Sequence, residues 1–345
     1  MFNPKYTITD LLLANITKIN SLVSELNNRR FAKLVLAEFE KTAKEVSTHT
    51  STCIEGNPLS LTDVKRVLRS KAINIRDTEK EVVNYNRALE ILNKLLKKEH
   101  LELSLKLLLK IHQQVTLELL PSYDSGALRK RPVIVNDPRT GKVAYLPPDV
   151  DSVTTLITEL IDFVAKNSDN INPLILAGIF HKQMVVIHPF MNGNGRTTRL
   201  MTKVLLAKMG LNTFNLFSFE NYYNQNVTKY FQTVGEYGDY NELVKTIDFT
   251  KWLEYFTGGI IDELLRVSNI LPDNGNSPET QLEPHHLKIL EHIKNNGYIT
   301  QRDYAKLTNR AKPTRALDFL KLIDLQLIER KGDGRGAHYI FKEKQ

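Results

Sequence analysis

Apolar positions recur at helical spacing over most of this chain, and the pattern predicts a mainly α-helical protein. Gly56 and Pro58 favour an end to the first long helix, because glycine adopts the left-handed conformation after a helix and proline cannot continue one. Thr62 is the expected N-cap of the next helix. The helices expected up to residue 117 are 31–54, 63–68, 78–96 and 104–117.

The pattern changes between residues 132 and 146. Two short runs rich in β-branched and aromatic residues flank a turn-forming sequence at 136–141, so we expect a β-hairpin with strands at 132–135 and 142–146. The helix over 174–186 is apolar on several faces, which indicates a central, buried position. The other helices expected here run from Asp149 or Asp151 to Ala165, over 197–209, and twice between 220 and 265.

The end of the chain predicts a separate small domain. Residues 271–284 are rich in proline, glycine and asparagine, as is typical of a linker. Beyond them the pattern gives three helices and two strands in the order of a winged helix: 286–295, 300–307, 312–325, 327–330 and 338–341. The predicted organisation is an N-terminal helical region (1–100), a helical core (101–268), a linker (269–283) and a C-terminal winged helix (284–345).

Composition is that of an ordinary globular protein. The 345 residues are 41% hydrophobic and 25% charged, which is enough to bury a core. Cys53 is the only cysteine, so an intramolecular disulfide is excluded. No apolar run reaches the roughly 20 residues of a membrane span, no signal peptide is evident, and we expect a cytoplasmic protein without a membrane partner. The net charge of +8 permits an anionic partner.

One stretch concentrates the candidate chemistry. It runs from His188 to Arg199 and reads HPFMNGNGRTTR. Its glycines let backbone N–H groups approach a phosphate, and the helix that follows adds the positive end of its dipole. Arg196 and Arg199 can hold further phosphate oxygens, and His188 stands where a general base would act. The stretch therefore predicts a phosphate-transfer site.

This stretch resembles the signature of the Fic family, His-x-Phe-x-(Asp/Glu)-Gly-Asn-Gly-Arg-x-x-Arg. Every fixed position matches except Asn192, where the family usually carries an acidic residue. The resemblance covers about 101–256 and implies a Fic helical core that transfers AMP from ATP to a Ser, Thr or Tyr hydroxyl of a target protein. Gly195 is intact, whereas a lysine there would have suggested the phosphate-transferring Doc branch.

The resemblance also implies a role for each residue of the signature. His188 takes the proton from the hydroxyl, whose oxygen attacks the α-phosphate as pyrophosphate leaves. Arg196 and Arg199 hold the outer phosphates, and Phe190 fixes the loop. The anion hole is formed by Gly193, Asn194 and Gly195.

Asn192 is the residue that puts metal use in question. In the family, the acidic residue at this position helps to hold Mg²⁺, whereas an asparagine oxygen ligates a hard cation without the charge. We therefore expect Mg²⁺ or Mn²⁺ to be held largely through the phosphates of ATP. The alternatives are an active enzyme with weaker metal dependence, one that prefers Mn²⁺, a slow enzyme, or a degenerate one retained for binding.

A second family pattern precedes the signature. Residues 51–56, STCIEG, resemble (Ser/Thr)-x-x-x-Glu-(Gly/Asn), in which a glutamate pairs with the second arginine of the signature. The resemblance implies that Ser51, Glu55 and Gly56 form an inhibitory element at the end of a helix. Glu55 would pair with Arg199 and fill the position of the γ-phosphate. Some relatives use this glutamate to remove AMP from targets, so de-adenylylation stays an alternative.

The resemblance places two further features near the nucleotide. The hairpin corresponds to a flap on which a target segment adds as an extra strand, with Gly126 and Arg129 resembling the flanks of the family's flap. Asn226 and Tyr230 resemble a segment near the adenine. The flap residues expected to dock the target are Val133, Ile134, Val135, Val143, Ala144 and Tyr145.

The C-terminal region is basic, with 13 Lys and Arg against 8 Asp and Glu from residue 280 on, a net charge of +5. The side chains of Lys306, Arg310, Lys312 and Arg315 on or before the third helix, and Arg335 at the tip of the hairpin, favour phosphate contacts to DNA. A module that binds a protein or forms a homodimer is the alternative.

Three histidines outside the signature are candidates for metal ligands or for structural residues. His285 and His286 have no metal-ligand companions at useful spacing and are expected to form a surface pair at a helix start. His181 is expected to be a core residue. No zinc site is expected.

Two functions of different classes follow from the sequence. The first is a protein adenylyltransferase inhibited by Glu55. The second is a DNA-binding regulator whose Fic core senses nucleotide. A variant of the first is the transfer of another nucleotide.

Overall fold

The computed structural model of the chain describes residues 2–29, 33–70, 75–96, 101–137, 140–207, 209, 217–271, 282–325 and 327–342. The chain divides into two compact units. Unit 1 comprises Met1–Asn27 and Ala43–Asn269, and unit 2 comprises Asn28–Thr42 and Ile270–Gln345. Most of the predicted linker lies outside the described residues, and so does the side chain of Arg335. The predicted domain boundaries stay predictions.

The protein is mainly helical, which confirms the predicted fold class. The N-terminal helices are α1 (Asp10–Asn28), α2 (Lys33–Ile54), α3 (Leu61–Arg69), α4 (Asp77–Leu96) and α5 (Leu105–Val115). The central helices are α6 (Val150–Lys166), α7 (Pro173–Ile187) and α8 (Asn194–Ala207). The helices that follow are α9 (Glu220–Gln225), α10 (Val227–Val234), α11 (Tyr240–Leu243) and α12 (Thr250–Ile270).

Three details differ from the sequence expectations. Ser60 rather than Thr62 caps α3, because the Ser60 hydroxyl accepts the N–H of Asp63. The helix expected to follow Arg196 begins earlier, at Asn194, inside the signature itself. Four helices, α9 to α12, occupy the segment in which two were expected, since short polar interruptions at Asn226 and around Gly238 divide it.

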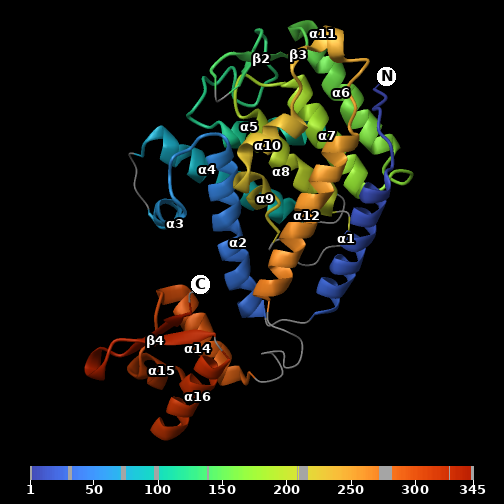
Figure 1. The fold of residues 1–345 in the computed structure, drawn as a ribbon. Coiled ribbons are helices and arrows are strands. Elements are labelled where there is room, and N and C mark those ends of the chain that lie inside the picture. The colour runs from blue at the N-terminus through green and yellow to red at the C-terminus, as the bar shows by residue number, and fades with distance from the viewer. Residues whose placement is uncertain are drawn as a thin grey trace. The chain divides into compact units, whose positions relative to one another are not determined.

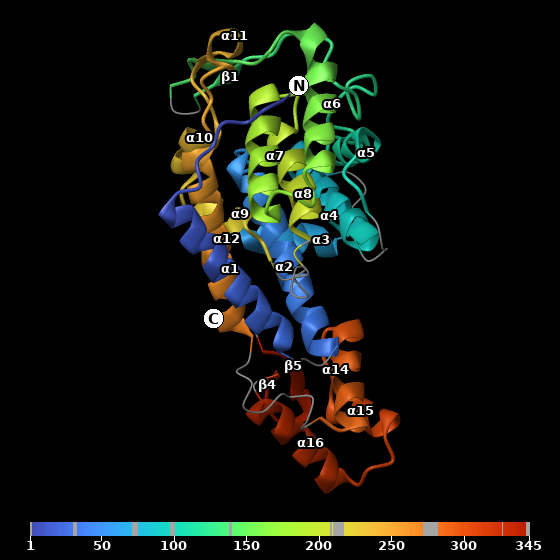
Figure 2. The same ribbon diagram turned by 90° about the vertical axis from the view of Figure 1, so that its right-hand side faces the viewer.

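Helices α7 and α8 lie side by side at the centre of unit 1 (Figures 1 and 2). Nearly every side chain of α7 is buried, as its apolar sequence predicts. Asn172 caps its start by accepting the N–H of Leu174. Gly178 lets α12 approach closely, and the indole of Trp252 donates to the Gly178 carbonyl at 2.8 Å. The catalytic candidates follow directly on this rigid helix, which fixes their position.

The predicted hairpin forms, but it is shorter than expected. Strand β1 (Val135–Asn136) pairs antiparallel with β2 (Val143–Leu146), and β2 also pairs in parallel with β3 (Gly238–Asp239). The sheet order β1-β2-β3 leaves β1 with one open edge. Both views place this small sheet at the same end of unit 1 as α11 (Figures 1 and 2).

Unit 2 contains the expected order of C-terminal elements. It holds α14 (Pro284–Asn296), α15 (Gln301–Leu307), α16 (Lys312–Asp324), β4 (Ile328–Lys331), a 3-10 turn η2 (Gly334–Gly336) and β5 (His338–Phe341). Strands β4 and β5 form an antiparallel hairpin, and Ile299 bridges to Tyr339 beside it. An apolar cluster that includes Ile289, Phe319 and Leu322 forms its core. Among the described helices, none combines the length and apolar character that crossing a membrane requires.

Candidate functional site

His188 lies at the end of α7 with its backbone in the left-handed region, at φ 50°. Its Nδ1 is 3.4 Å from the carbonyl oxygen of Val185, which can only accept, so Nδ1 carries the proton and Nε2 keeps its lone pair. The half-buried ring lines a cavity of unit 1, and burial lowers the pKa of His188 to about 4. A neutral imidazole with a free Nε2 is the form that accepts a proton.

The loop after His188 is held rigidly. Phe190 is fully buried and stacks on the ring of His112 from α5, with centroids 3.7 Å apart. Both amide atoms of the Asn194 side chain bond the Phe190 backbone, each at 2.9 Å. Gly193 has φ 76°, and a Cβ there would meet Thr116 at 2.9 Å. The loop therefore tolerates little displacement, and the N-terminus of α8 is fixed beside the cavity.

His112 is a site residue that the sequence analysis missed. Its Nε2 donates to the backbone carbonyl of Asn192 at 2.9 Å, and its Nδ1 accepts the N–H of Gly126 at 3.0 Å. Burial lowers the pKa of His112 to about 4, so it stays neutral in this role. In the sequence it is one polar residue on an apolar helix, 76 positions before His188, and no local pattern marks it.

Arg199 and Glu55 form the ion pair that the resemblance implies. The Arg199 Nη2 donates to Glu55 Oε1 at 2.8 Å, and Arg199 also donates to the hydroxyl and the carbonyl of Ser51, each at 2.8 Å. Burial raises the pKa of Glu55, but the Arg199 and Arg196 guanidinium groups outweigh it and leave that pKa below its ordinary value. Glu55 is therefore an anion that occupies an arginine suited to phosphate.

Glu55 is held in place by the way α2 ends. The N–H of Gly56 donates to the Cys53 carbonyl at 2.9 Å and the N–H of Asn57 donates to the Thr52 carbonyl at 3.1 Å. Gly56 has φ 91°. This pair of bonds with a left-handed glycine is a Schellman motif, and Glu55 is its C-cap residue. The turn aims the carboxylate at Arg199 instead of leaving it on a frayed helix end.

The buried face of α2 next to this turn is polar. Its fully or nearly fully buried hydroxyl residues are Ser47, Thr48, Thr50, Ser51 and Thr52. Ala43 and Ile54 are the buried apolar residues described in the same segment. The Ser47 and Ser51 hydroxyls bond residues of other elements, whereas those of Thr50 and Thr52 bond the backbone of α2 itself.

Arg196 does not share the cavity of His188. Its Nη1 pairs with Glu81 of α4 at 2.7 Å, and its Nη2 donates to Asn192 Oδ1 at 3.1 Å. Arg196 and Asn192 line a second cavity of about 250 Å³ together with Asp77 and Glu81. Both arginines of the signature are therefore paired with a carboxylate from the N-terminal region. Glu81 is the second site residue that the sequence analysis missed.

The cavity of His188 has a volume of about 490 Å³. His188, Asn194 and Gly195 line it on the signature side, and Glu55 with Gly56 on the side of α2. The remaining predicted residues on its wall are Val135, Ala144, Tyr145 and Tyr230. A Cβ on Gly195 would collide with the Glu55 carboxylate and lie 2.9 Å from Arg199 Nη1. The cavity thus brings together His188, the start of α8, Glu55 and part of the hairpin.

The two predicted adenine residues differ in their surroundings. Tyr230 borders the cavity, and its hydroxyl lies 3.0 Å from Nε2 of His181. His181 is fully buried and also lies 3.0 Å from the Thr202 hydroxyl, which confirms it as a core residue. The side chain of Asn226 caps α10 by accepting the N–H of Lys229 at 2.9 Å and is not on the cavity wall.

Hydrogen bonds attach the flap and its flank to the end of α7 and to the first residue of the signature. The buried Tyr145 donates its hydroxyl to the Val186 carbonyl at 3.0 Å, and Arg129 Nε donates to the His188 carbonyl at 2.9 Å. Ile134 and Val143 are exposed, by 53% and 54%, so this side of the hairpin keeps an apolar surface. The open strand edge and the base are held at a fixed separation by these contacts.

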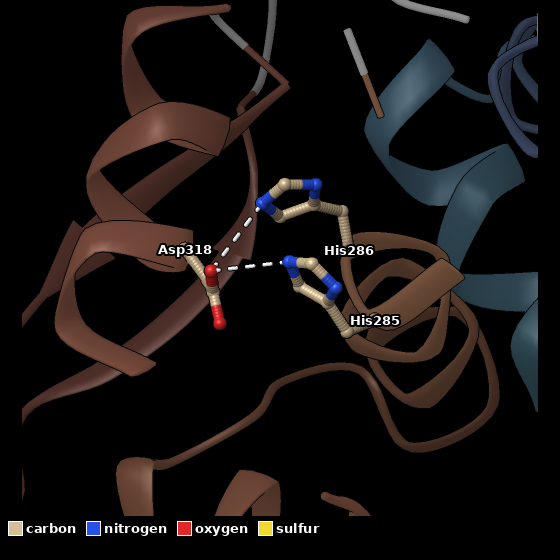
Figure 3. Close-up of side chains that lie close together, drawn as sticks. All are labelled: His285, His286 and Asp318. Atoms are coloured by element: carbon tan, nitrogen blue, oxygen red, sulfur yellow. Dashed lines mark ion pairs between the residues drawn. The ribbon is translucent and has the colours of Figure 1, made fainter. Parts of the chain in front are cut away.

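The histidine pair in unit 2 corrects the sequence expectation. His286 is buried, and Asp318 of α16 is a companion, 3.2 Å from His285 Nε2 and 3.5 Å from His286 Nε2 (Figure 3). His286 Nδ1 accepts the N–H of Glu283, so its proton is on Nε2 and that atom has no lone pair for a metal. Asp318 also pairs with Arg310 at 2.9 Å. Asp318 thus connects α16 to the two histidines of α14 and to Arg310.

Comparison with known proteins gives a consistent result. Residues 102–206 match the model of the Fic/DOC family. Protein adenylyltransferase fic-1 of Caenorhabditis elegans is 29% identical over 201 residues, which are 56% of this chain and 38% of that protein. Protein adenylyltransferase Fic of Drosophila willistoni is 27% identical over 217 residues, 57% of this chain and 42% of that protein. The chain spans less than half the length of these relatives.

Two solved structures share the fold. A Fic family protein from Desulfovibrio desulfuricans G20 aligns with 100% of this chain and 99% of its own, with a TM-score of 0.69 and 20% identity. Fic-1 from C. elegans aligns with 75% of this chain and 72% of its own, with a TM-score of 0.60 and 21% identity. The matched family stretch includes the flap and the signature, whereas Glu55, Glu81 and Tyr230 lie outside it.

Proposed function

We propose that this chain, whose residues 102–206 form a Fic domain, transfers AMP from ATP to a Ser, Thr or Tyr hydroxyl of a protein, itself included. We further propose that Glu55 keeps it inhibited. The observation that carries the proposal is one cavity in which His188 offers a free Nε2 while Glu55 pairs with Arg199 at 2.8 Å. His188 Nε2 is able to accept a proton, while the Glu55 carboxylate occupies Arg199, to which the phosphates of ATP would bind.

The chemistry of the step is simple to assign. Nε2 of His188 takes the proton of the target hydroxyl. The hydroxyl oxygen forms a bond to the α-phosphorus, the bond from that phosphorus to the oxygen bridging to the β-phosphate breaks, and pyrophosphate leaves with the electron pair. Such transfers depend mainly on positioning and on neutralising phosphate charge. A positioned base contributes roughly 10²–10⁴-fold to the rate.

Three features fit a triphosphate. The buried Nη1 of Arg199 has no hydrogen-bond partner among the described residues, which is costly for a guanidinium unless a ligand supplies one. Gly195 has no side chain to block the approach, and α8 begins beside it. The cavity volume of about 490 Å³ lies in the range of nucleotide-sized sites.

The site offers few protein ligands for Mg²⁺ or Mn²⁺. The Oδ1 of Asn192 is the candidate ligand from the signature, and Arg196 already donates to it at 3.1 Å. A neutral oxygen shared with a guanidinium is a weak cation ligand, so the phosphates of ATP would supply most of the coordination. When bound, the ion neutralises phosphate charge.

The flap supports docking of an extended target segment. Strand β2 is paired on both sides, so the open edge of β1 is the one to which a target strand adds. Val135 of β1 also lines the cavity of His188. Main-chain bonds along β1 would therefore align a target hydroxyl with the base, with the exposed Ile134 and Val143 adding apolar contact.

The test is transfer of label from ATP labelled on the α-phosphate. Purified wild type, Glu55→Gly and Glu55→Gly combined with His188→Ala are incubated with Mg²⁺ or Mn²⁺, with and without a cell lysate as a source of targets. Label on protein that rises in Glu55→Gly and disappears in the double variant supports the proposal. No label with any variant, metal or lysate would remove the transferase proposal.

For unit 2 we propose a winged helix that binds a protein rather than DNA. Two of the basic side chains expected to contact DNA have internal partners: Arg310 pairs with Asp318, and Arg315 donates to the Arg310 carbonyl at 2.9 Å. On α16, Leu317 and Leu320 are exposed instead. Salt-dependent binding to a random DNA duplex, abolished by Lys312→Ala, would refute this.

The cytoplasmic location and a homodimer stay predictions.

A further inference from the structure

Glu81 connects the inhibitory turn to the signature. Its Oε1 pairs with Arg196 Nη1 at 2.7 Å, and its Oε2 accepts from Asn57 Nδ2, also at 2.7 Å. Asn57 follows Glu55 and Gly56 directly and closes the turn through its own N–H to the Thr52 carbonyl. One carboxylate therefore links the first arginine of the signature to the residue that ends the turn of Glu55.

Asn57 is an unusual residue for its place. The position after the left-handed glycine of a Schellman motif commonly makes an apolar contact back to the helix. Here it is a buried asparagine, 5% exposed, that donates both to Glu81 and to the Thr78 carbonyl at 2.8 Å. The turn is thus fastened to α4 by two polar bonds, one of which is made to the Glu81 carboxylate. A change at Glu81 acts directly on the turn.

The surroundings give Glu81 a place to move. Its side chain is 23% exposed, and it borders the 250 Å³ cavity that Arg196 also lines. The buried Nε of Arg196 has no hydrogen-bond partner among the described residues. An anion that draws Arg196 toward itself would remove the ion pair that positions the Glu81 side chain for Asn57.

We propose that Glu81 is a positioning residue that latches the inhibitory turn, holding Glu55 on Arg199 by way of Asn57. This inference rests on the proposed function of Glu55. A phosphate that draws Arg196 away from the cavity it shares with Glu81 removes the ion pair that fixes the position of Glu81, so that the hold on Asn57 loosens and Glu55 leaves Arg199. The two arginines of the signature thereby act together, although each contacts a different carboxylate.

Cys53 supplies a probe of the turn that requires no enzymatic activity. It is the only cysteine of the chain, it is half-buried, and it precedes Glu55 by two residues on the cavity wall. Its rate of alkylation by iodoacetamide in the nucleotide-free protein reports how often the end of α2 opens. We expect Glu81→Gln and Asn57→Ala to raise this rate three- to tenfold. Asp77→Asn removes a charge from the same cavity without touching the latch and should leave the rate unchanged.

A double-mutant cycle separates the latch from simple competition for Arg196. In the chain with Glu55, Glu81→Gln and Asn57→Ala should each lower the Kd of ATP three- to tenfold, as measured by equilibrium dialysis with Mg²⁺. In the Glu55→Gly background neither should tighten ATP binding further, because no inhibitory carboxylate remains to release. A merely structural role would lower the melting temperature in both backgrounds without tightening ATP binding.

Two results would overturn the latch. The first is alkylation of Cys53 at the wild-type rate in both Glu81→Gln and Asn57→Ala. The second is a gain in ATP affinity that persists undiminished in the Glu55→Gly background. Neither readout uses AMP transfer, so a chain that shows the latch and yet labels no protein would refute the proposed function alone.

Discussion

Replacing Glu55 by glycine should tighten binding of ATP and leave binding of AMP unchanged. The substitution removes one hydrogen-bonded ion pair, the 2.8 Å contact to Arg199 Nη2, and leaves both bonds from Arg199 to Ser51 in place. Glu55 lies one residue beyond the end of α2, so glycine there interrupts no helix. The substitution therefore removes the hydrogen bond from Arg199 to Glu55 without interrupting α2.

The size of the effect follows from that single contact. A hydrogen bond between charged groups contributes about 1.5–3 kcal/mol, and each 1.4 kcal/mol corresponds to a tenfold change in an equilibrium constant. If ATP must displace this bond before it engages Arg199, the Kd of ATP should fall by about 10- to 150-fold in Glu55→Gly. AMP has no β- or γ-phosphate, so its Kd should change by less than about twofold.

Isothermal titration calorimetry with ATP, ADP and AMP, each with Mg²⁺, measures the three constants directly. Glu55→Gln is the matched control, because it keeps the shape and one acceptor oxygen but loses the charge, and it should fall between wild type and glycine. An equal gain for AMP and ATP would show that the substitution merely opens the cavity. An unchanged Kd of ATP would show that Glu55 does not compete with phosphate.

Three further predictions test other parts of the site. Burial holds the pKa of His188 near 4 in the wild type, and loss of the Glu55 charge, which raises that pKa, should lower it further in Glu55→Gly, so kcat/KM of this variant should stay flat from pH 8 to 5.5; a fall centred near 6.5 would contradict this assignment. Asn192→Asp keeps the acceptor for Arg196 and adds a charge, so half-maximal transfer should need about tenfold less Mg²⁺, and an unchanged metal dependence would place the ion elsewhere. Gly178→Ala puts a methyl group 2.5 Å from Leu253, which should cost about 1–3 kcal/mol and lower the melting temperature by several degrees in calorimetry, whereas an unchanged transition would show that α12 can shift.

The sequence predicted the features that depend on residues close to one another along the chain. The helical periodicity, the left-handed Gly56 and the turn-rich segment before Val143 were sufficient for the main elements, and the mainly helical fold is confirmed. The observed helix boundaries differ from the predicted ones where two residues could serve as the N-cap. At α3, Ser60 is preferred to Thr62 because its hydroxyl can also bond the side chain of Asp63.

Contacts between distant helices could not be predicted in this way. His112 and Glu81 lie on helices whose apolar patterns reveal only which face is buried, and their partners, Asn192 and Arg196, are 80 and 115 positions away. The pairing of Glu55 with Arg199 came from a family resemblance rather than from any local rule. The network around His286 was missed for the same reason, since Asp318 comes from a different helix.

The hydroxyl-lined face of α2 has a thermal consequence. Burial of apolar surface is what gives protein transitions their large heat capacity and makes their free energy curve with temperature. The buried residues near the end of α2 are mostly Ser47, Thr48, Thr50, Ser51 and Thr52, with Ala43 and Ile54 as the buried apolar ones, so its release exposes less apolar area than that of an aliphatic helix face. The equilibrium between the inhibited and the released states should therefore change little between cold and warm conditions, and occupancy of the site by ligand, rather than temperature, should set it.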